Sequence, residues 1–600
     1  MMAPAPGLDV FPRPAQAMSS IYALNEDILL AIFSYIHGAD ALNAALVSRG
    51  LYPFAIPRVA SRAKSITSEE LQRLCDYMLL PGHGHGPHAR VRANYLHILS
   101  VNAAMTSTYD WKFDVQGWTS DAEIAQQMAI LHRFSCLLSH AEALRELRLT
   151  GIPWSSVWMG SYISKVGTAM SALNSLRILD CSGVTDELVS SLPPLQTLGC
   201  LHLAYVDERR VYHSDTGWTW TDVPSTLSSL FHALSGFPRI HELVLENFRP
   251  VEIEQYFYEE VSPEPDWLLQ RFPSIQDLTL RHCSPATTLF VSLCPRLSCL
   301  SIGLLPQTSG RPARSLATTA LPLCPPLRHL FISPVDLRFV VQRLSTVQRL
   351  YCTDAYSDSR YGAIPLNGFA QALSALSPTR VLRSFGLRQE RQPEAQAFWE
   401  GLRTTQPGVR SMDLVVGAIV DEGTWISLFR RMAKALPRLP FLVALRFIVD
   451  LSFCKCLTLY THRHCRLEPG ESWLRAQTEG VGVLVQHAFR YIPTLEVVAI
   501  ARGPAVVSHT PPYLMEYMNV HDPYVYYPPP DYVLKQIYTK GDAEVQQTYQ
   551  FTWFCRGRGA NHLIKVPNAV GQQICDLMEN GDKTPAAELV DQLLPPSRSS

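Results

Sequence analysis

The sequence lacks any apolar run long enough to cross a membrane, an excess of either charge, and a dense set of cysteines. Its longest apolar runs, such as residues 414–420, are far shorter than the ~18 residues that a membrane span needs. The 52 Lys and Arg residues balance 53 Asp and Glu residues, so the overall charge predicts neither a nucleic-acid nor a membrane partner. Fourteen cysteines in 600 residues are too few for a disulfide scaffold.

Signals of secretion are also missing. None of the eleven asparagines begins an Asn-x-Ser/Thr sequon, and prolines interrupt residues 1–20 where a signal peptide needs an unbroken apolar core. Hydrophobic residues make up 47% of the chain and charged residues 18%, which is typical of a folded globular protein. We therefore expect a soluble intracellular protein, in the cytoplasm, the nucleus or both.

The N-terminal part predicts a small helical domain at residues 21–62, after a Pro/Ala-rich disordered tail at 1–20. Between Ile28 and Ile36, apolar residues recur at i, i+1, i+4, i+5 and i+8, which indicates an amphipathic helix. Asn25 is a suitable N-cap for this helix. A second helix is expected from Asp40 to Val47, and two prolines break the third segment.

A different pattern follows from about residue 141 to 505. An apolar residue, two others, an apolar residue, one other and an apolar residue recur twelve times. The units start at Leu144, Leu173, Leu198, Ile240, Ile275, Leu297, Leu327, Val347, Leu382, Val409, Leu442 and Leu495. Several units follow a proline, as in FPRIHELVL, and a proline that ends a helix before a short strand suits a helix–turn–strand repeat. We expect an irregular leucine-rich-repeat-like solenoid, with a mixed α/β domain without true repeats as the alternative.

Two regions flank the predicted repeats. Residues 63–140 are expected to be a mostly helical linker or N-terminal cap, since Thr67 with Glu70 fits a capping box, although 95–101 could form a strand. Residues 506–600 are expected to contain a Pro/Tyr-rich strap and a cap over the end of the repeats.

Residues 24–54 resemble an F-box. The positions that match the family pattern are Leu24, Glu26, Ile28 or Leu29, Ile32, Phe33, Tyr35, Asp40, Leu42, Val47, Ser48 and Arg49. Asn25 stands where the family usually has proline, and Ala41 stands where leucine is common. Together with degenerate leucine-rich repeats, this segment is similar to fungal F-box proteins, and the expected fold class is α/β, with a three-helix F-box followed by the solenoid.

The resemblance implies a substrate-recognition subunit of an SCF-type (cullin–RING) ubiquitin ligase. The F-box would bind a Skp-family adaptor, and through it a cullin, while the repeats would bind a target protein. The residues implied in adaptor binding are Leu24, Ile28, Ile32, Phe33, Leu42 and Val47. The alternative is a leucine-rich-repeat interaction scaffold with no role in a ubiquitin ligase.

No motif predicts catalysis, a metal or a cofactor. Cys454, Cys456, His462, His464 and Cys465 lack the two-residue gaps that present two ligands to one zinc ion, and His83, His85 and His88 occupy a glycine-rich loop. Nucleotide-loop, zinc-protease and nucleophile-elbow motifs are absent from the sequence. Catalytic residues that converge only in space would leave no such motif, so an enzyme remains a third alternative.

Overall fold

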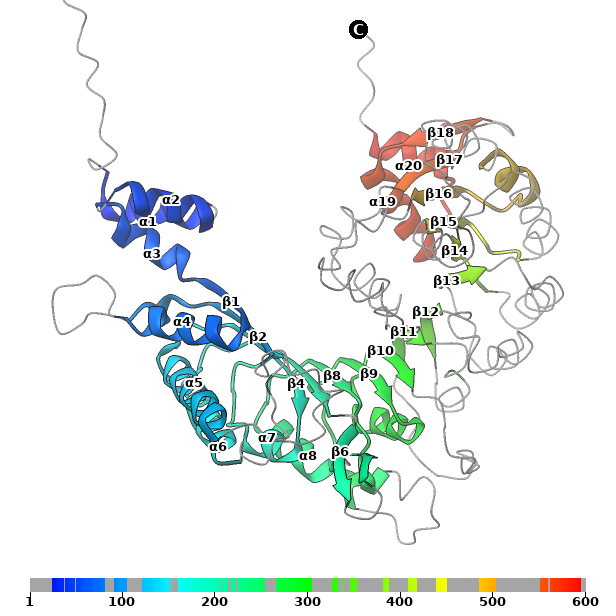
Figure 1. Cartoon of the computed structure of the whole chain (residues 1–600). Helices are drawn as coiled ribbons and strands as arrows, with labels where there is room; N and C mark the ends of the chain where they lie inside the picture. The colour runs from blue at the N-terminus through cyan, green and yellow to red at the C-terminus, as the bar shows by residue number, and fades with distance from the viewer. Residues whose placement is uncertain are drawn as a thin grey trace, which may run out of the picture. The chain divides into compact units, whose positions relative to one another are not determined.

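The computed structural model describes just over half of the chain, in two compact units. The described residues are 24–36, 38–48, 50–80, 91–104, 121–150, 152, 160–206, 208–213, 217–222, 225–253, 266–304, 326–332, 337, 346–352, 381–387, 408–417, 439–450, 485–502, 551–558 and 562–594. Unit 1 comprises Met1–Gly199 with Ser235–Pro238, and unit 2 comprises Cys200–Leu234 with Arg239–Ser600 (Figure 1). None of the helices within these ranges is both long and apolar enough to span a membrane.

Unit 1 begins with three short helices, α1 (Glu26–Tyr35), α2 (Gly38–Val47) and α3 (Tyr52–Val59). The side chain of Asn25 accepts a hydrogen bond from the amide of Asp27 at 3.1 Å, which confirms the predicted N-cap. Glu26 and Asp27 place negative charge in the first turn of α1, where the helix dipole favours it.

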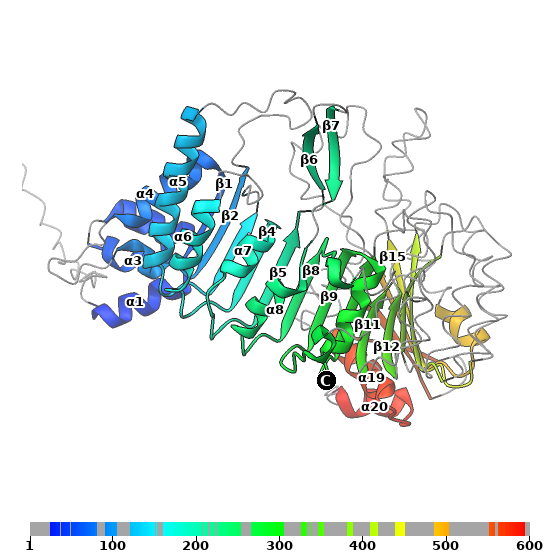
Figure 2. The ribbon, with the colours of Figure 1, turned by 90° about the horizontal axis from the view of Figure 1, so that it is seen from below.

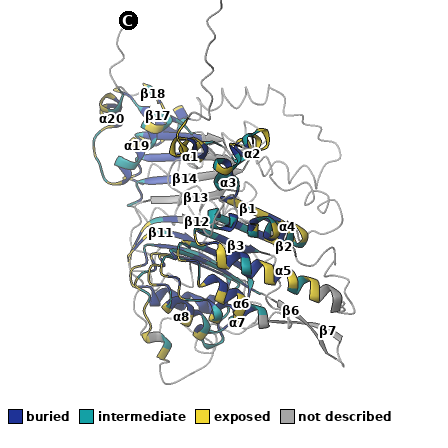
Figure 3. Ribbon diagram, turned by 90° about the vertical axis from the view of Figure 1, so that its left-hand side faces the viewer, coloured by how far each residue is buried: buried dark blue, intermediate teal, exposed yellow. Residues whose placement is uncertain are grey.

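The rest of unit 1 alternates strands with helices. In chain order the elements are β1 (Arg62–Thr67), α4 (Ser68–Leu79), the 3-10 helix η2 (Arg92–Tyr95), β2 (Ile98–Ala104), α5 (Asp121–His140), β3 (Glu146–Thr150), α6 (Gly160–Met170), β4 (Ile178–Val184) and α7 (Asp186–Ser191). The strands pair in parallel in the order β1-β2-β3-β4. Helices α4, α5 and α6 lie along one face of these strands (Figure 2), and α5 turns its exposed side outward (Figure 3).

Unit 2 continues the same alternation with more strands. Its elements are β5 (Cys200–Tyr205), β6 (Glu208–His213), β7 (Gly217–Asp222), α8 (Leu227–Ser235), β8 (Glu242–Glu246), η4 (Asp266–Leu269), β9 (Asp277–Cys283), η5 (Pro285–Leu293), β10 (Cys299–Leu304), β11 (Leu327–Ile332), β12 (Val347–Cys352), β13 (Val381–Leu387), β14 (Ser411–Gly417), β15 (Ala444–Asp450), β16 (Val497–Arg502), β17 (Phe551–Arg556), β18 (Leu563–Val566), α19 (Asn568–Glu579) and α20 (Ala586–Leu593). Strands β5 and β8 to β16 run in parallel, β17 and β18 are antiparallel, and β6 with β7 forms a separate hairpin.

One buried residue per strand stacks into a continuous ladder in each unit. In unit 1 the ladder is Leu99, Leu147 and Leu179, and in unit 2 it runs through Leu201, Leu243, Leu278, Leu300, Leu330 and Leu350. All of these side chains are at most 1% exposed. Each of the twelve predicted repeat units falls on a parallel strand, β3 to β5 or β8 to β16. The predicted α/β repeat architecture is therefore confirmed.

The register corrects two of those units. In the unit predicted as Leu382-Phe385-Leu387, it is Leu382 that pairs with the middle residues Leu350 and Met412, and the register shifts between Leu382 and Phe385.

Leu179, not Leu176, pairs with Leu147, so the second repeat is Leu176-Leu179-Cys181 rather than Leu173-Leu176-Ile178. Leu173 is completely buried, as are Leu176 and Leu179. Because these three leucines are three residues apart, the pattern fits both when it starts at Leu173 and when it starts at Leu176.

The repeats also begin earlier than predicted. Residues 63–140 were expected to be a mostly helical linker, but β1 and β2 lie at the start of the parallel sheet. The sequence of β1, RAKSIT, has no apolar triplet, and Ala63 takes the ladder position beside Leu99. Because most residues of this end strand are polar, a search for a leucine pattern did not identify β1. The capping box is present, since the Thr67 hydroxyl accepts from the Glu70 amide at 3.1 Å.

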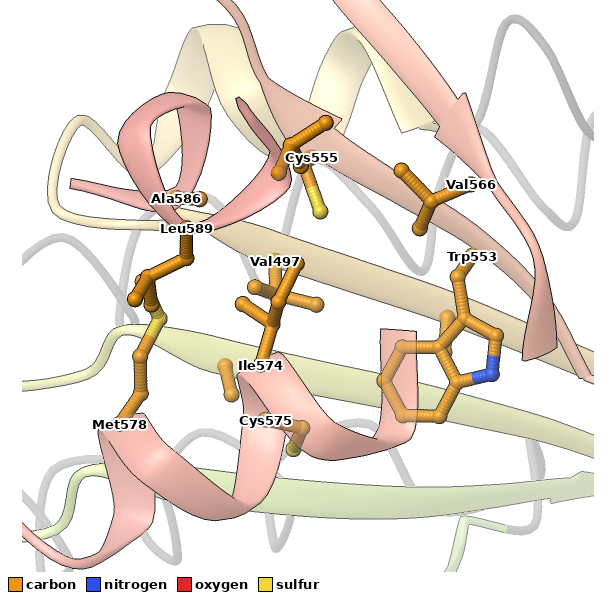
Figure 4. Packing of buried hydrophobic residues seen from close by; sticks show 12 residues of the cluster. Val497, Trp553, Cys555, Val566, Ile574, Cys575, Met578, Ala586 and Leu589 are labelled. Atoms are coloured by element: carbon orange, nitrogen blue, oxygen red, sulfur yellow. The ribbon is translucent and has the colours of Figure 1, made fainter. Parts of the chain in front are cut away.

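The C-terminal helices pack on the face of the sheet opposite the ladder. Ala444, Val497 and Ala499 alternate with the ladder residues Leu445 and Val498, so they point to the other face. Their partners in one buried cluster include Trp553 from β17, Ile574 and Met578 from α19, and Leu589 from α20 (Figure 4). Strands β15 and β16 are thus buried on both faces. The strap predicted at 511–532 lies outside the described residues.

Gly571 gives a direct test of this packing. A Cβ atom at Gly571 would overlap the ring of Trp553, which is itself completely buried. We expect Gly571→Ala to lower the free energy of unfolding by about 1–3 kcal/mol through overpacking. The matched control is Gly303→Ala in β10, where a Cβ atom would meet nothing within 4 Å. Urea unfolding followed by Trp fluorescence measures both variants, and equal losses would contradict the assigned packing.

Candidate docking face of the N-terminal helical bundle

The three N-terminal helices share a core built from three large and three small side chains. Leu29 and Phe33 of α1 are each 3% exposed, and they pack against small residues of the other two helices. The members of this core are Leu29, Phe33, Ala41, Ala45, Leu51 and Ala55. The alanines let α2 and α3 approach α1 closely, so the core is compact although the bundle is small.

A second apolar stripe of α1 faces away from that core. Ile28 and Ile32 are four residues apart on α1 and are 48% and 38% exposed, and Leu24, just before the N-cap, is 39% exposed. On α2, Leu42 is 43% exposed and Val47 is 88% exposed. Five of the six predicted adaptor-binding residues therefore lie on the surface of the bundle, and we refer to these five as the docking face.

Phe33 differs from the other five. Its ring lies in the core of the bundle, so its role in this structure is to hold α1 against α2 and α3. Phe33 follows Ile32 directly, and neighbouring positions of a helix point about 100° apart, which places them on different faces. The sequence pattern did not show that Ile32 is exposed and Phe33 is buried.

Three further exposed apolar residues were not among the residues predicted to bind the adaptor. Tyr35 is 88% exposed, Leu46 is 76% exposed and Leu30 is 43% exposed. Tyr35 follows Ile32 by three residues and Leu46 follows Leu42 by four, so helical spacing was a signal that could have found them. Eight of the thirteen large exposed apolar side chains among the described residues lie between Leu24 and Val47. Exposed apolar side chains are thus concentrated in the N-terminal bundle.

A histidine–carboxylate pair joins two strands of unit 2. The Nε2 atom of His202 in β5 lies 3.6 Å from a carboxylate oxygen of Glu246 in β8. The polar contact with His202 lowers the pKa of Glu246, and the charges of His202, Arg281 and His282 act in the same direction. The pair bridges paired strands, so it contributes to the stability of the sheet, and this contribution is lost as the pH falls through the lowered pKa of Glu246.

The buried cysteines have inert thiols. Burial raises the pKa of the Cys75, Cys283 and Cys555 thiols to about 12, and it also raises the pKa of Cys181. A neutral thiol is a poor nucleophile and a poor metal ligand. Within the described ranges, no three His, Cys, Asp or Glu residues gather as metal ligands. The cysteines and histidines singled out at 454–465 and 83–88 fall outside those ranges.

Comparisons with known proteins add no family. No family model matches the chain, and no curated protein matches it. Among solved structures, the chain is similar to one described as the crystal structure of the Rad7 and Elc1 complex in yeast. The identity is 13% and the TM-score is 0.25, over 65% of this chain and 88% of that one. At that TM-score the similarity carries no weight for the fold or for the site.

The division of α1 into a core face and a docking face is testable by stability. We expect Phe33→Ala to lower the free energy of unfolding of the bundle by about 3–5 kcal/mol, because it leaves a cavity in the core. Ile28→Ala at the docking face is expected to change it by no more than about 0.5 kcal/mol. Hydrogen exchange of the α1–α3 amides measures both values. A loss for Ile28→Ala as large as that for Phe33→Ala would refute the division.

The raised thiol pKa values predict slow alkylation and a loss of stability at high pH. Above about pH 8.5 these thiols ionise in the unfolded chain but stay protonated in the folded one, so stability falls as pH rises toward 12. At pH 8, iodoacetamide should modify the partly exposed Cys136 before Cys75, Cys283 or Cys555. Mass spectrometry of the modified peptides gives each rate, and equally rapid modification of Cys75 would argue against its burial.

Proposed function

We propose that the protein is the substrate-recognition subunit of an SCF-type ubiquitin ligase. In this proposal the N-terminal bundle is an F-box that binds a Skp-family adaptor, and through it a cullin, while the repeats hold a target protein. The observation that carries the proposal is the docking face, an exposed apolar surface on the segment whose sequence resembles an F-box.

The chemistry of the docking face suits burial against helices of a partner. Ile28 and Ile32 lie one turn apart on α1, as do the anchors with which an amphipathic helix binds an apolar groove, and Leu24 is exposed just before the helix. Tyr35 continues the row that Ile28 and Ile32 form, and tyrosine is among the side chains enriched at interface centres. Glu26 and Asp27 lie at the start of α1, so they border the apolar row rather than interrupt it.

In this proposal the exposed strand face of the repeats is the surface for a target. On β3 and β4 the side chains that alternate with the ladder include Glu146, Arg148 and Ile178, all of them partly or fully exposed. This strand face lies opposite the ladder face. Repeat proteins commonly bind partners along such a face.

Two other functions remain as alternatives with distinct tests. A repeat scaffold without a ligase role would share the fold but would not bind the adaptor. An enzyme would need convergent catalytic groups with pKa values suited to proton transfer. The buried thiols of Cys75 and Cys283 instead have raised pKa values that disfavour nucleophilic attack. We therefore propose a binding role without catalysis, in the cytoplasm, the nucleus or both.

Adaptor binding is tested by co-expression and pull-down with a Skp-family adaptor. We expect the double variant Ile28→Asp, Ile32→Asp to weaken binding by about 100-fold or more, since each buried aliphatic side chain contributes about 1.5–3 kcal/mol. The control is Ser34→Asp, which adds one negative charge on another face of α1. Circular dichroism checks the folding of each variant. Absence of binding by the wild type would favour the scaffold, and equal loss in the control would exclude the docking face.

A further inference from the structure

The three-helix bundle joins the first repeat without a linker. Helix α3 ends at Val59 and β1 begins at Arg62 (Figure 1). The carbonyl oxygen of Ser61 accepts hydrogen bonds from the amides of His97 and Ile98, at 2.8 and 3.0 Å. The chain that leaves α3 is therefore tied to the start of β2. These backbone bonds fix the path of the chain at the junction. The orientation of the three helices relative to the first strands depends in addition on side-chain contacts.

Arg92 is the side chain that connects the elements at this junction. It belongs to η2, it is 9% exposed, and its Nη2 atom donates to the hydroxyl of Tyr52 in α3 at 2.9 Å. Its Nη1 atom donates to the carbonyl oxygen of Tyr77 in α4 at 3.3 Å. Its guanidinium carbon also lies 4.2 Å from the centre of the Tyr77 ring, which is a cation–π contact. One residue thus contacts the bundle and the first repeat together.

Stability alone does not explain a buried guanidinium here. Burying a charge is costly, and the Nε atom of Arg92 is buried without a hydrogen-bond partner among the described residues. An apolar side chain of similar volume would fill the same space at a lower cost. The guanidinium instead restricts the orientation of the bundle. Its planar donors reach the Tyr52 hydroxyl and the Tyr77 carbonyl in only one orientation.

We propose that Arg92 is a positioning residue that fixes the orientation of α1–α3 relative to β1–β4, so that the docking face and the first repeats move as one body. The consequence for ubiquitin transfer depends on the proposed function. A fixed junction would hold a bound target at a constant distance from the ligase machinery, which favours transfer through proximity. The coupling itself does not depend on adaptor binding.

Single-molecule energy transfer on the full chain tests the coupling. Dyes would be attached to unnatural amino acids at Asn43 in α2 and at Glu142 before β3, both of which are exposed. We expect a narrow distance distribution in the wild type, a broad one in Arg92→Met, and an intermediate width in Tyr52→Phe. The matched control is Arg58→Met, which removes the bond from Arg58 Nε to the carbonyl oxygen of Ile36 at 2.9 Å inside the bundle.

The outcomes separate the coupling from general destabilisation. A wild-type width in Arg92→Met, or equal broadening in Arg58→Met, would overturn the proposal. If circular dichroism shows that Arg92→Met is unfolded, the width in Tyr52→Phe decides, because that variant loses only a hydroxyl. Adaptor pull-down is a separate readout, and we expect Arg92→Met to retain binding. Failure of the wild type to bind would refute the ligase role and leave the coupling result unchanged.

Discussion

The whole structure depends on the parallel register that stacks one buried apolar residue per strand. Each strand is only four to seven residues long, and a single repeat cannot bury its apolar side without a neighbour. Leu278 in β9, for example, pairs with Leu243 on one side and with Leu300 on the other. A slip of one residue would turn every ladder side chain to the opposite face. Stability therefore comes from contacts between neighbouring repeats.

That constraint makes the ends of a stack different from its interior. At the N-terminal end of unit 1, Ala63 replaces a large ladder residue, and α3 leads directly into the first strand. At the C-terminal end of unit 2 the chain reverses, since β17 pairs antiparallel with β16 and β18 pairs antiparallel with β17. There Arg410 donates to the carbonyl oxygens of Met578 and Asp582, at 3.0 and 3.2 Å, near the end of α19. Cations are favourable at that end of a helix, so α19 is held by charge as well as by apolar packing.

The sequence predicted these repeats well because the ladder residue is apolar in nearly every strand. It predicted the first strand poorly, because RAKSIT carries polar residues at the surface of an end strand and only alanine at the ladder position. The second repeat was misplaced by three residues because Leu173 is buried as well as Leu176 and Leu179. A pattern identifies which residues are apolar, whereas register and frame are decided by the partner strand.

At the candidate site, too, the sequence identifies the apolar residues but not their partners. Two apolar stripes of α1 could each fill the core of the bundle. Leu29 and Phe33 form one stripe, and Ile28 and Ile32 form the other, so α1 alone does not determine which stripe is buried. The choice is made by α2 and α3, whose small side chains at Ala41, Ala45 and Ala55 leave room for a leucine and a phenylalanine. Once that core is filled, Ile28 and Ile32 have no partner within the bundle core and stay at the surface. The surface that we propose for the adaptor is thus a consequence of how the bundle packs.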